Sequence, residues 1–387
     1  MEQIDRAVTY LCSWYPSRID LQNGNFIQRH AEAIGEHIPV TVIYAVSDPS
    51  IQEIELSENQ RGNLLEVIAY FPKQSWLWRR YSVHRSACEA AIARAIALRP
   101  YLSDSSVSAV HLQVAHPMGL YARELSRRWR QVMVMTEHST VLLASRRSDM
   151  AWWRQWLFRY VGKRVSHVCP VSRDLGKAIM DLGIAAPQTV IPNVVDTSIF
   201  LAKQTRSDDI HRWIHVSTLA DDHKNVTGIL HAMAASLQAY PSQSLTLIGN
   251  GFQDQHRATC VELGLSTTQV RIVSEQPIEE VAREMREHDG FILFSNYENL
   301  PCVISEAHCC GLPVIATDVG GVREMISADD GIVIQKQDQQ ALVQAMDQMR
   351  NQHWESDAIR RVAVDRYSYD AVARLYLSVY DNLVKTA

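Results

Sequence analysis

Residues 290–321 read GFILFSNYENLPCVISEAHCCGLPVIATDVGG, and this stretch decides the fold class. It contains an apolar run of strand length up to Ser295, a short polar loop, and Pro301 at the position expected for the first residue of a helix. A second apolar run, LPVIAT, follows from residue 312. Strand, helix and strand in this order are typical of a parallel sheet whose faces are covered by helices.

Apolar runs of the same kind recur along the chain, with amphipathic segments between them. This alternation predicts an α/β protein with two doubly wound, Rossmann-like domains. The polar stretch KQTRSDDIHR, residues 203–212, separates the two series and is the expected linker. We expect an N-terminal domain over residues 1–202, a C-terminal domain over residues 203–367, and a helix over 368–387 that packs back on the first. The expected strands are AVTYLCSW (7–14), PVTVIYAV (39–46), SAVHLQ (108–113), QVMVMTE (131–137), HVCPVS (167–172), QTVIP (188–192), WIHVSTL (213–219), SLTLIG (244–249), QVRIV (269–273), GFILFS (290–295), LPVIAT (312–317) and GIVIQ (331–335).

The composition is that of an ordinary globular protein. The 387 residues are 47% hydrophobic and 21% charged, which excludes a disordered chain, a collagen and a disulfide-stabilised miniprotein. We find no signal peptide and no apolar run long enough to span a membrane. The seven cysteines include no C-x-x-C pair and lie in apolar segments, so a cytoplasmic location is expected. The residues from Trp354 onward contain no Pro or Gly and are expected to be helical, with tyrosines that mostly pack.

The N-terminal half contains a basic, aromatic segment. Residues 123–164 carry ten basic and three acidic side chains, interleaved with Trp152, Trp153 and Trp156, although the whole chain has a net charge of −5. Such a segment can lie on an anionic membrane, so we expect residues 146–164 to contact the inner membrane face. The alternative, a tryptophan-rich core face with a solvated row of arginines, stays open. No nucleic-acid partner is expected.

Two carboxylates flank the start of the helix expected in the opening stretch. A helix N-terminus favours an anion such as a diphosphate. Carboxylates beside a phosphate site can accept hydrogen bonds from sugar hydroxyls, so Glu298 and Glu306 indicate a site for a nucleotide sugar. The alternative is a solvated loop glutamate and a first-turn glutamate that complements the helix dipole. The expected backbone donors are Asn299, Leu300, Cys302 and Val303.

This segment resembles the Glu-x7-Glu motif of retaining glycosyltransferases of family 4, which have the two-domain GT-B fold. The resemblance implies a catalytic cleft between the domains, in which Glu298 contacts the donor sugar and Glu306 the ribose. It extends over most of the chain, because similar motifs occur in the family's order. These are Asn23-Gly24-Asn25-Phe26, His111-x-Gln113, Thr136-Glu137-His138, Ile191-Pro192-Asn193-x-x-Asp196, Lys224-Asn225, Gly249-x-Gly251 and Glu298 to Glu306.

Lys224 is expected to open a helix after a strand and to stabilise the departing diphosphate. Members of the family often carry an arginine six residues earlier, where this chain has Thr218. Either Arg271, Arg323 or a backbone contact compensates, or the enzyme is slower or uses a different donor geometry. Gly249 and Gly251 form a glycine loop that could bind a nucleotide, although this loop alone is weak evidence. The resemblance places Gln276 near the nucleobase.

Acceptor-side residues are expected after the strands of the N-terminal domain. Many relatives have His-x-His where this chain has His111-x-Gln113, so His116 or His138 is the expected substitute near the reacting carbon. Gly24 and Asn25 precede a helix, in a loop expected to approach the donor diphosphate or the acceptor. Each of these residues also has a purely structural interpretation.

The predicted activity is a retaining glycosyltransferase that moves a hexose-type sugar from a nucleoside-diphosphate sugar, UDP-linked, to a glycan or lipid-linked glycan in cell-surface polysaccharide synthesis. No metal or other cofactor is expected, since the chain has no Asp-x-Asp and no zinc-type histidine motif. Two alternatives stay open: a nucleotide-sugar epimerase of the same fold, and a non-catalytic partner in a polysaccharide-assembly complex. A nicotinamide oxidoreductase is disfavoured because the dinucleotide fingerprint is incomplete.

Overall fold

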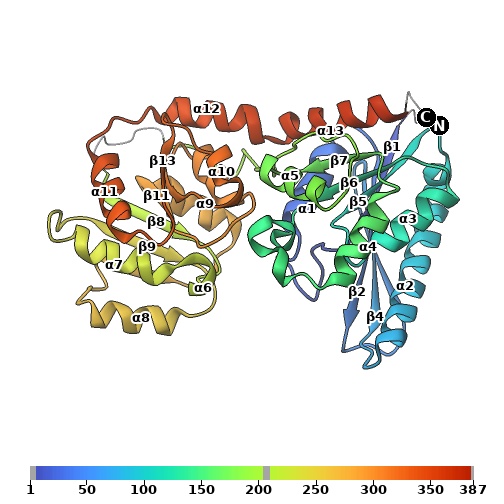
Figure 1. The fold of residues 1–387 in the computed structure, drawn as a ribbon, viewed down its shortest axis with the longest axis horizontal. Helices are drawn as coiled ribbons and strands as arrows, with labels where there is room; N and C mark the ends of the chain where they lie inside the picture. Colours follow the sequence, from blue (N-terminus) through green and yellow to red (C-terminus); the bar gives the residue numbers. More distant parts are fainter. Residues whose placement is uncertain (1–5, 204–209, 385–387) are drawn as a thin grey trace. The chain divides into compact units, whose positions relative to one another are not determined.

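The structure is a computed structural model that describes residues 6–203 and 210–384. The chain divides into two compact units, one of Met1–Val194 with Tyr369–Ala387 and one of Val195–Ser368 (Figure 1). The first boundary therefore lies before residue 195 and not after residue 202, and the second lies one residue later than expected. The reason is packing, because Val194 is buried in the core of the first unit and Thr197 O accepts a hydrogen bond from Arg360 at 3.2 Å in the second. Residues 204–209 of the expected linker lie outside the described residues.

The first unit is built on a seven-stranded sheet with the order β3-β4-β2-β1-β5-β6-β7. All neighbours run parallel except β3, which is antiparallel to β4 at one edge. The strands are β1 (Ala7–Cys12), β2 (Val40–Asp48), β3 (Glu55–Arg61), β4 (Leu64–Pro72), β5 (Ser108–Gln113), β6 (Met133–Glu137) and β7 (His167–Pro170).

One predicted strand of this sheet is wrong, and two observed strands were not predicted. Strand β3 is exposed along its whole length and its sequence ELSENQR lacks an apolar face, whereas β4, LLEVIAYFP, is a largely buried apolar run that the strand assignment overlooked. The expected strand at 188–192 forms only an isolated bridge, Val168 to Gln188. That segment runs beside β7, where Ile191 N donates to Pro170 O at 3.0 Å, but it does not continue the ladder.

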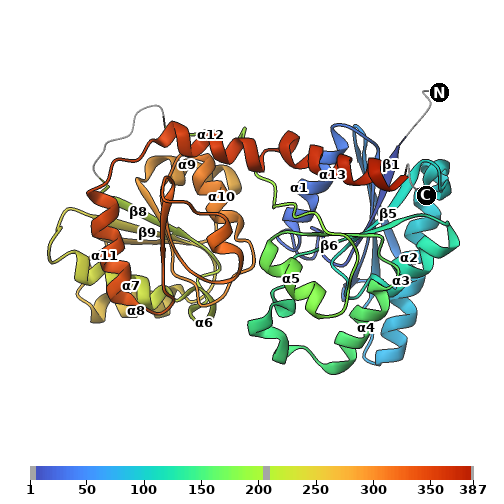
Figure 2. The same ribbon diagram turned by 45° about the horizontal axis from the view of Figure 1, so that its top comes forward.

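Helices cover the first sheet, and the chain's last helix returns to it. Helix α13 packs on α1 (Figure 2). Its Tyr376 and Tyr380 are buried in a core shared with β1 and β2. The residues after Trp354 are helical as expected, and they form two helices, because Ser368 is extended and separates α12 from α13. The α-helices are α1 (Asn25–Gly35), α2 (Leu77–Leu98), α3 (Gly119–Arg128), α4 (Trp152–Gly162), α5 (Arg173–Asp181) and α13 (Tyr369–Val384), and the 3₁₀ helices are η1 (Pro100–Ser103), η2 (Thr140–Leu142) and η3 (Ala144–Asp149).

The second unit is a six-stranded, all-parallel sheet with the order β10-β9-β8-β11-β12-β13. Its six strands coincide with the six predicted runs. The strands are β8 (Arg212–Val216), β9 (Ser244–Ile248), β10 (Val270–Val273), β11 (Gly290–Leu293), β12 (Val314–Thr317) and β13 (Gly331–Ile334). The helices are α6 (Asp221–Lys224), α7 (Val226–Ser236), α8 (Gln253–Glu262), α9 (Ile278–Glu287), α10 (Cys302–Cys309), η4 (Gly320–Glu324), α11 (Gln339–Arg350) and α12 (Ser356–Tyr367).

Each sheet has one point where the order of strands reverses. In the first unit the chain adds β2 on one side of β1 and β5 on the other, and in the second it adds β9 and β11 on the two sides of β8. Ligands of open α/β sheets bind outside the carboxyl ends of the strands at such a point. The residues after β1 and β5, and after β8 and β11, are therefore the first to consider.

Candidate functional site

A buried ion pair occupies the reversal point of the second unit. Lys224, after β8, places its Nζ 2.5 Å from Oε1 of Glu298, which follows β11. The Ser295 hydroxyl donates to the same carboxylate oxygen at 2.7 Å. Both members of the pair are buried, Glu298 to 6% exposure and Lys224 to 8%.

The charge of Glu298 is maintained by its neighbours. Burial alone would raise the pKa of this carboxyl, but attraction to Lys224, with a smaller effect of His223, lowers it to about 2. The carboxylate is therefore ionised throughout the physiological range. A charge held in this way accepts hydrogen bonds strongly, which suits recognition of sugar hydroxyls.

His223 and Tyr297 belong to this site, although they were not predicted. The two rings stack at a centroid distance of 4.1 Å and an angle of 2°. The Nε2 atom of His223 lies 3.6 Å from Glu298 Oε1, too far for a hydrogen bond. His223 directly precedes Lys224 in the chain, and Tyr297 directly precedes Glu298. This adjacency to two predicted residues could have identified both rings from the sequence.

Lys224 does not open a helix as expected. It is the last residue of α6, a single turn, and α7 begins at Val226 after Asn225 in the left-handed region. Pro301, likewise, is not the first helical residue but the one before it, since α10 begins at Cys302. Both shifts leave the side chains at the carboxyl edge of the sheet.

Neither arginine proposed as a substitute for the family's missing one joins this ion pair. Arg271 pairs with Glu284 of α9, and Arg323 donates to Asp318 at 3.0 Å. His223 is the additional ionisable group next to Lys224 and Glu298.

The other donor-side residues lie around the same edge. Glu306, in α10, is 7% exposed, and the first turn of this helix contains Cys302 and Val303. Asn299 and Leu300 are buried in the loop before it. The remaining donor-side predictions follow the neighbouring strands β9 and β10, at Gly249 with Gly251 and at Gln276.

Gly249 has a structural reason to be glycine. A Cβ at this position would lie 1.7 Å from Ser217 O, so the ends of β8 and β9 approach closely only because the side chain is absent. Gln276 is partly exposed, and its amide donates to Ser274 O at 3.2 Å. These contacts place both residues near the edge and assign them no further role.

Three acceptor-side histidines differ in environment. His111 is buried beneath α13, where Nδ1 lies 2.6 Å from the Tyr380 hydroxyl and Nε2 lies 2.8 Å from Thr136 Oγ1. His138 is also buried, and burial lowers the pKa of its imidazole well below the usual value. His116 is exposed, and its ring lies 6.0 Å from that of Trp153.

The loop at Gly24 is shaped by the protein itself. Gly24 precedes α1 with φ 72°, and a Cβ there would lie 2.7 Å from the carbonyl carbon of Trp14. Asn25 begins the helix, and its side chain donates to Gln22 at 3.0 Å. The contact with Trp14 accounts for the glycine, and the expected approach to a ligand stays a prediction.

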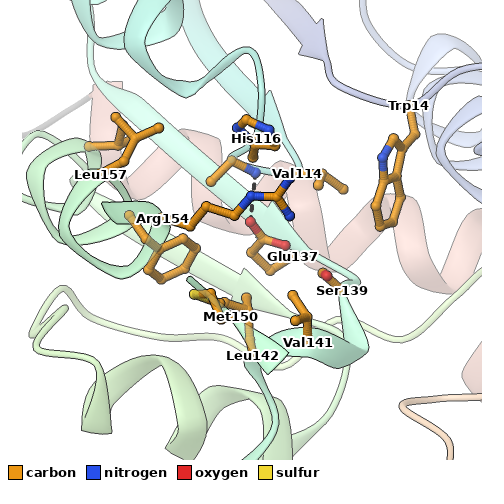
Figure 3. A pocket seen from close by; sticks show the side chains of 13 residues that line it. Trp14, Val114, His116, Glu137, Ser139, Val141, Leu142, Met150, Arg154 and Leu157 are labelled. Carbon is orange, nitrogen blue, oxygen red and sulfur yellow. Dashed lines mark hydrogen bonds between the residues drawn. The ribbon is translucent and has the colours of Figure 1, made fainter. Parts of the chain in front are cut away.

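A pocket of about 210 Å³ opens at the reversal point of the first unit (Figure 3). Its walls come from the segments after β1, β5 and β6 and from α4. Glu137, the last residue of β6, is its buried polar group, with 1% exposure. Its Oε1 accepts from Ala115 N at 2.6 Å, and burial raises the pKa of the carboxyl to about 7.

The backbone of this pocket is strained. Val114, which lines it, has φ 65°, a left-handed conformation that a β-branched residue rarely adopts and that costs about 1–3 kcal/mol. Hydrogen bonds on both sides hold it there, because Ser13 Oγ donates to Val114 O at 2.6 Å and Val114 N donates to Thr136 O at 2.9 Å. Hydrogen-bonded strand ends therefore shape this wall.

Helix α4 presents aromatic side chains to solvent beside this pocket. Trp152 is 79% exposed and Trp156 60% exposed, and Trp156 stacks on Tyr160 at 5.5 Å. The Arg123 guanidinium lies 4.4 Å from the centre of the Tyr160 ring. The interpretation of these tryptophans as core residues is therefore wrong.

The described part of the chain contains neither a membrane-spanning helix nor a cluster of metal-binding side chains. Between residues 6–203 and 210–384, no helix is both long and apolar enough to cross a bilayer. In the same ranges, no group of three or more His, Cys, Asp or Glu side chains is arranged to hold a metal ion.

Two family descriptions match successive parts of the chain. "Glycosyltransferase Family 4" matches residues 24–199, and "Glycosyl transferases group 1" matches residues 201–366. A D-inositol 3-phosphate glycosyltransferase of Corynebacterium urealyticum is 27% identical over 170 residues, which are 40% of this chain and 39% of that protein. The match thus spans about two fifths of the length of this relative.

Solved structures resemble the whole chain. Sucrose-phosphate synthase from Thermosynechococcus elongatus superimposes with a TM-score of 0.73 at 17% identity, over 99% of this chain and 100% of that one. HepE of Anabaena, solved with UDP and glucose, gives a TM-score of 0.68 at 16% identity, over 98% and 100%. At such identities the similarity shows the fold, which is GT-B. The two matched family descriptions, read with the fold and the Glu-x7-Glu loop, show that the chain belongs to glycosyltransferase family 4.

Proposed function

We propose that the protein is a retaining glycosyltransferase that uses a nucleoside-diphosphate sugar, UDP-linked, and transfers a hexose-type sugar to a glycan or lipid-linked glycan. The observation that carries the proposal is the buried pair of Lys224 and Glu298 at the reversal point of the second unit. A cation there can bind a diphosphate, and the carboxylate beside it can accept hydrogen bonds from sugar hydroxyls.

The residues take the following roles in this proposal. Lys224 binds the diphosphate and stabilises the charge that develops as the bond from the anomeric carbon to the phosphate oxygen breaks. His223 supplies the second donor in place of the arginine missing at Thr218. Glu298 orients the sugar and Glu306 binds the ribose.

The acceptor hydroxyl attacks from the face that the diphosphate leaves. A new bond forms between the acceptor oxygen and the anomeric carbon, and the acceptor proton passes to a phosphate oxygen. This course retains the anomeric configuration without a carboxylate nucleophile. The NMR coupling constant of the product's anomeric proton tests it, since an inverted product would contradict retention.

A thermal-shift panel of nucleotide sugars tests the donor. A ligand at about 100 times its Kd stabilises the folded state by roughly 2.7 kcal/mol. We expect a UDP-sugar to raise the melting temperature of the wild type more than UDP does, and Glu298→Gln to lose that difference. A panel in which no nucleotide sugar stabilises the wild type would contradict the proposal.

The exposed tryptophans of α4 support a further part of the proposal, contact with an anionic membrane surface that carries a lipid-linked acceptor. Tryptophan with arginine is typical of interfacial helices. Arg154 and Arg159 lie on the same helix as Trp152 and Trp156. Such contact would hold the first unit at the inner membrane face, where a lipid-linked acceptor for cell-surface polysaccharide synthesis would lie.

A further inference from the structure

The pocket at the reversal point of the first unit has apolar walls around one buried polar group. Met150, Leu157 and Phe158 contribute to the walls, and Glu137 lies at the centre of the labelled side chains in Figure 3. Glu137 Oε2 is buried and accepts no hydrogen bond of normal geometry from the described residues. The backbone N–H groups of His138 and Ser139 lie close enough to the carboxyl to lower its pKa, but the effect of burial outweighs theirs. We call this cavity the Glu137 pocket.

An unpartnered oxygen in such a place is unfavourable for the folded protein. Buried polar groups are nearly always hydrogen-bonded, and the exceptions need an explanation. The strained Val114 beside it is a second local cost at the same place. A ligand that enters the pocket and donates a hydrogen bond to Oε2 would remove the first of these costs.

The charges around the pocket restrict the kind of ligand. Arg154 lines it and disfavours a cation, while the Glu137 carboxylate disfavours an anion. His116, also in the lining, has its pKa lowered by the partial burial of its ring and by Arg154, although the residue as a whole is exposed, so it adds no fixed charge. A neutral hydroxyl fits both states of Glu137, since it donates to the carboxylate and accepts from the protonated acid.

We propose that the Glu137 pocket is an acceptor subsite that holds an uncharged alcohol with an apolar ring or chain, whose hydroxyl bonds to Glu137 Oε2. This inference rests on the proposed function and names the acceptor class that the first unit selects. The exposed tryptophans of α4, the helix that also contributes Leu157 and Phe158 to the pocket walls, suit an alcohol that arrives from a membrane surface.

Two small probes of similar shape test the proposal in the full-length protein. Cyclohexanol carries the hydroxyl, and methylcyclohexane replaces it with a methyl group. Binding is followed by NMR of protein labelled at the methionine methyls, with the Met150 signal assigned from Met150→Leu and Met233, buried in the other unit, as the internal control. We expect cyclohexanol to shift the Met150 signal, and we expect the ratio of its affinity to that of methylcyclohexane to be about tenfold higher in wild type than in Glu137→Leu.

Two variants separate the hydrogen bond from the shape of the pocket. Glu137→Leu should lower this affinity ratio about tenfold, whereas Glu137→Gln, which keeps an acceptor for Ala115 N, should retain it. An affinity ratio that is the same in wild type and in Glu137→Leu would overturn the proposal. A Met150 signal that responds to neither probe would also overturn the proposal, because the pocket would then bind no alcohol of this kind.

The test is independent of the donor. If UDP-sugars stabilise the protein and are transferred while cyclohexanol leaves Met150 unchanged, the acceptor subsite is wrong and the proposed function stands. If cyclohexanol binds as expected and no nucleotide sugar binds, the proposed function fails, and the acceptor assignment fails with it.

Discussion

The two sheets reverse their strand order in the same way, but the groups at the two reversal points have opposite electrostatics. In the second unit Glu298 is paired with Lys224, and its pKa is lowered to about 2. In the first unit Glu137 has one unpartnered oxygen, and burial raises its pKa to about 7. Both carboxyls are buried, so the difference comes from the nearby cation and not from depth.

The same reversal of strand order therefore supports two different kinds of binding site. A paired, permanently charged site suits a ligand that brings charge of its own, such as a diphosphate. An uncompensated carboxyl among apolar walls suits a neutral ligand that brings a hydrogen-bond donor. The four predictions below test this contrast, beginning with the largest effect.

Removal of either member of the ion pair should have the largest effect. We expect Lys224→Ala and Glu298→Gln each to lower kcat/KM for sugar transfer by about a hundredfold or more, because electrostatic stabilisation of the departing diphosphate is lost. Arg271→Ala, which removes an exposed arginine of the same unit, is the matched control and should leave the rate unchanged. A transfer rate within threefold of wild type in either variant would contradict the role of the pair.

Replacing Glu137 should change how stability depends on pH. Because its pKa is raised from the ordinary 4.5 to about 7, its contribution to the free energy of unfolding is fully present below pH 4.5 and is lost as the pH rises through about 7. Relative to wild type, Glu137→Gln should therefore gain up to about 3 kcal/mol between pH 4.5 and pH 8. Urea unfolding at several pH values measures this gain.

Glu298→Gln is the matched control for that experiment. The pKa of Glu298 is lowered to about 2, so its stabilising contribution is present above about pH 4.5 and is lost only as the pH falls through 2. Its difference from wild type should stay constant between pH 5 and pH 8. A constant difference for Glu137→Gln as well would remove the contrast between the two carboxyls.

The exposed tryptophans of α4 should contribute to membrane binding. We expect the double variant Trp152→Ser with Trp156→Ser to sediment with phosphatidylglycerol vesicles at least about tenfold more weakly than wild type. Trp76→Ser, which removes a tryptophan 66% exposed elsewhere in the same unit, is the control. Vesicle binding that is unchanged in the double variant, or absent from wild type at low salt, would contradict the proposed contact of α4 with a membrane.

His223 should have the smallest effect, because its side chain is partly exposed. His223→Phe keeps a ring to stack on Tyr297 but removes the nitrogens, and we expect UDP to bind about threefold more weakly by calorimetry. His223→Arg should bind UDP more tightly than wild type. His231→Phe, at an exposed position of α7, is the control and should leave the affinity for UDP unchanged. An unchanged affinity for UDP in His223→Phe would contradict the role of His223 as a second donor.

Much of the fold follows from local patterns in the chain. All six strands of the second unit were predicted, because each is a short apolar run that is buried in a parallel sheet. Strand β3 was not, since its polar sequence becomes a strand only through pairing with β4. The unit boundary was misplaced for a related reason, since Val194 belongs to the first unit only through its contacts in that core.

The α/β class, the order of the motifs and the choice of Glu298 and Lys224 as candidates could be predicted from the chain, because they depend on residues close together in sequence. The contact of Lys224 with Glu298, the position of His223 beside them and the buried Oε2 of Glu137 in a pocket became known only from the fold. Pairing and burial depend on which distant segments meet, and a carboxyl's charge depends on both. The same residue type therefore became a fixed charge in one sheet and a titratable group in the other.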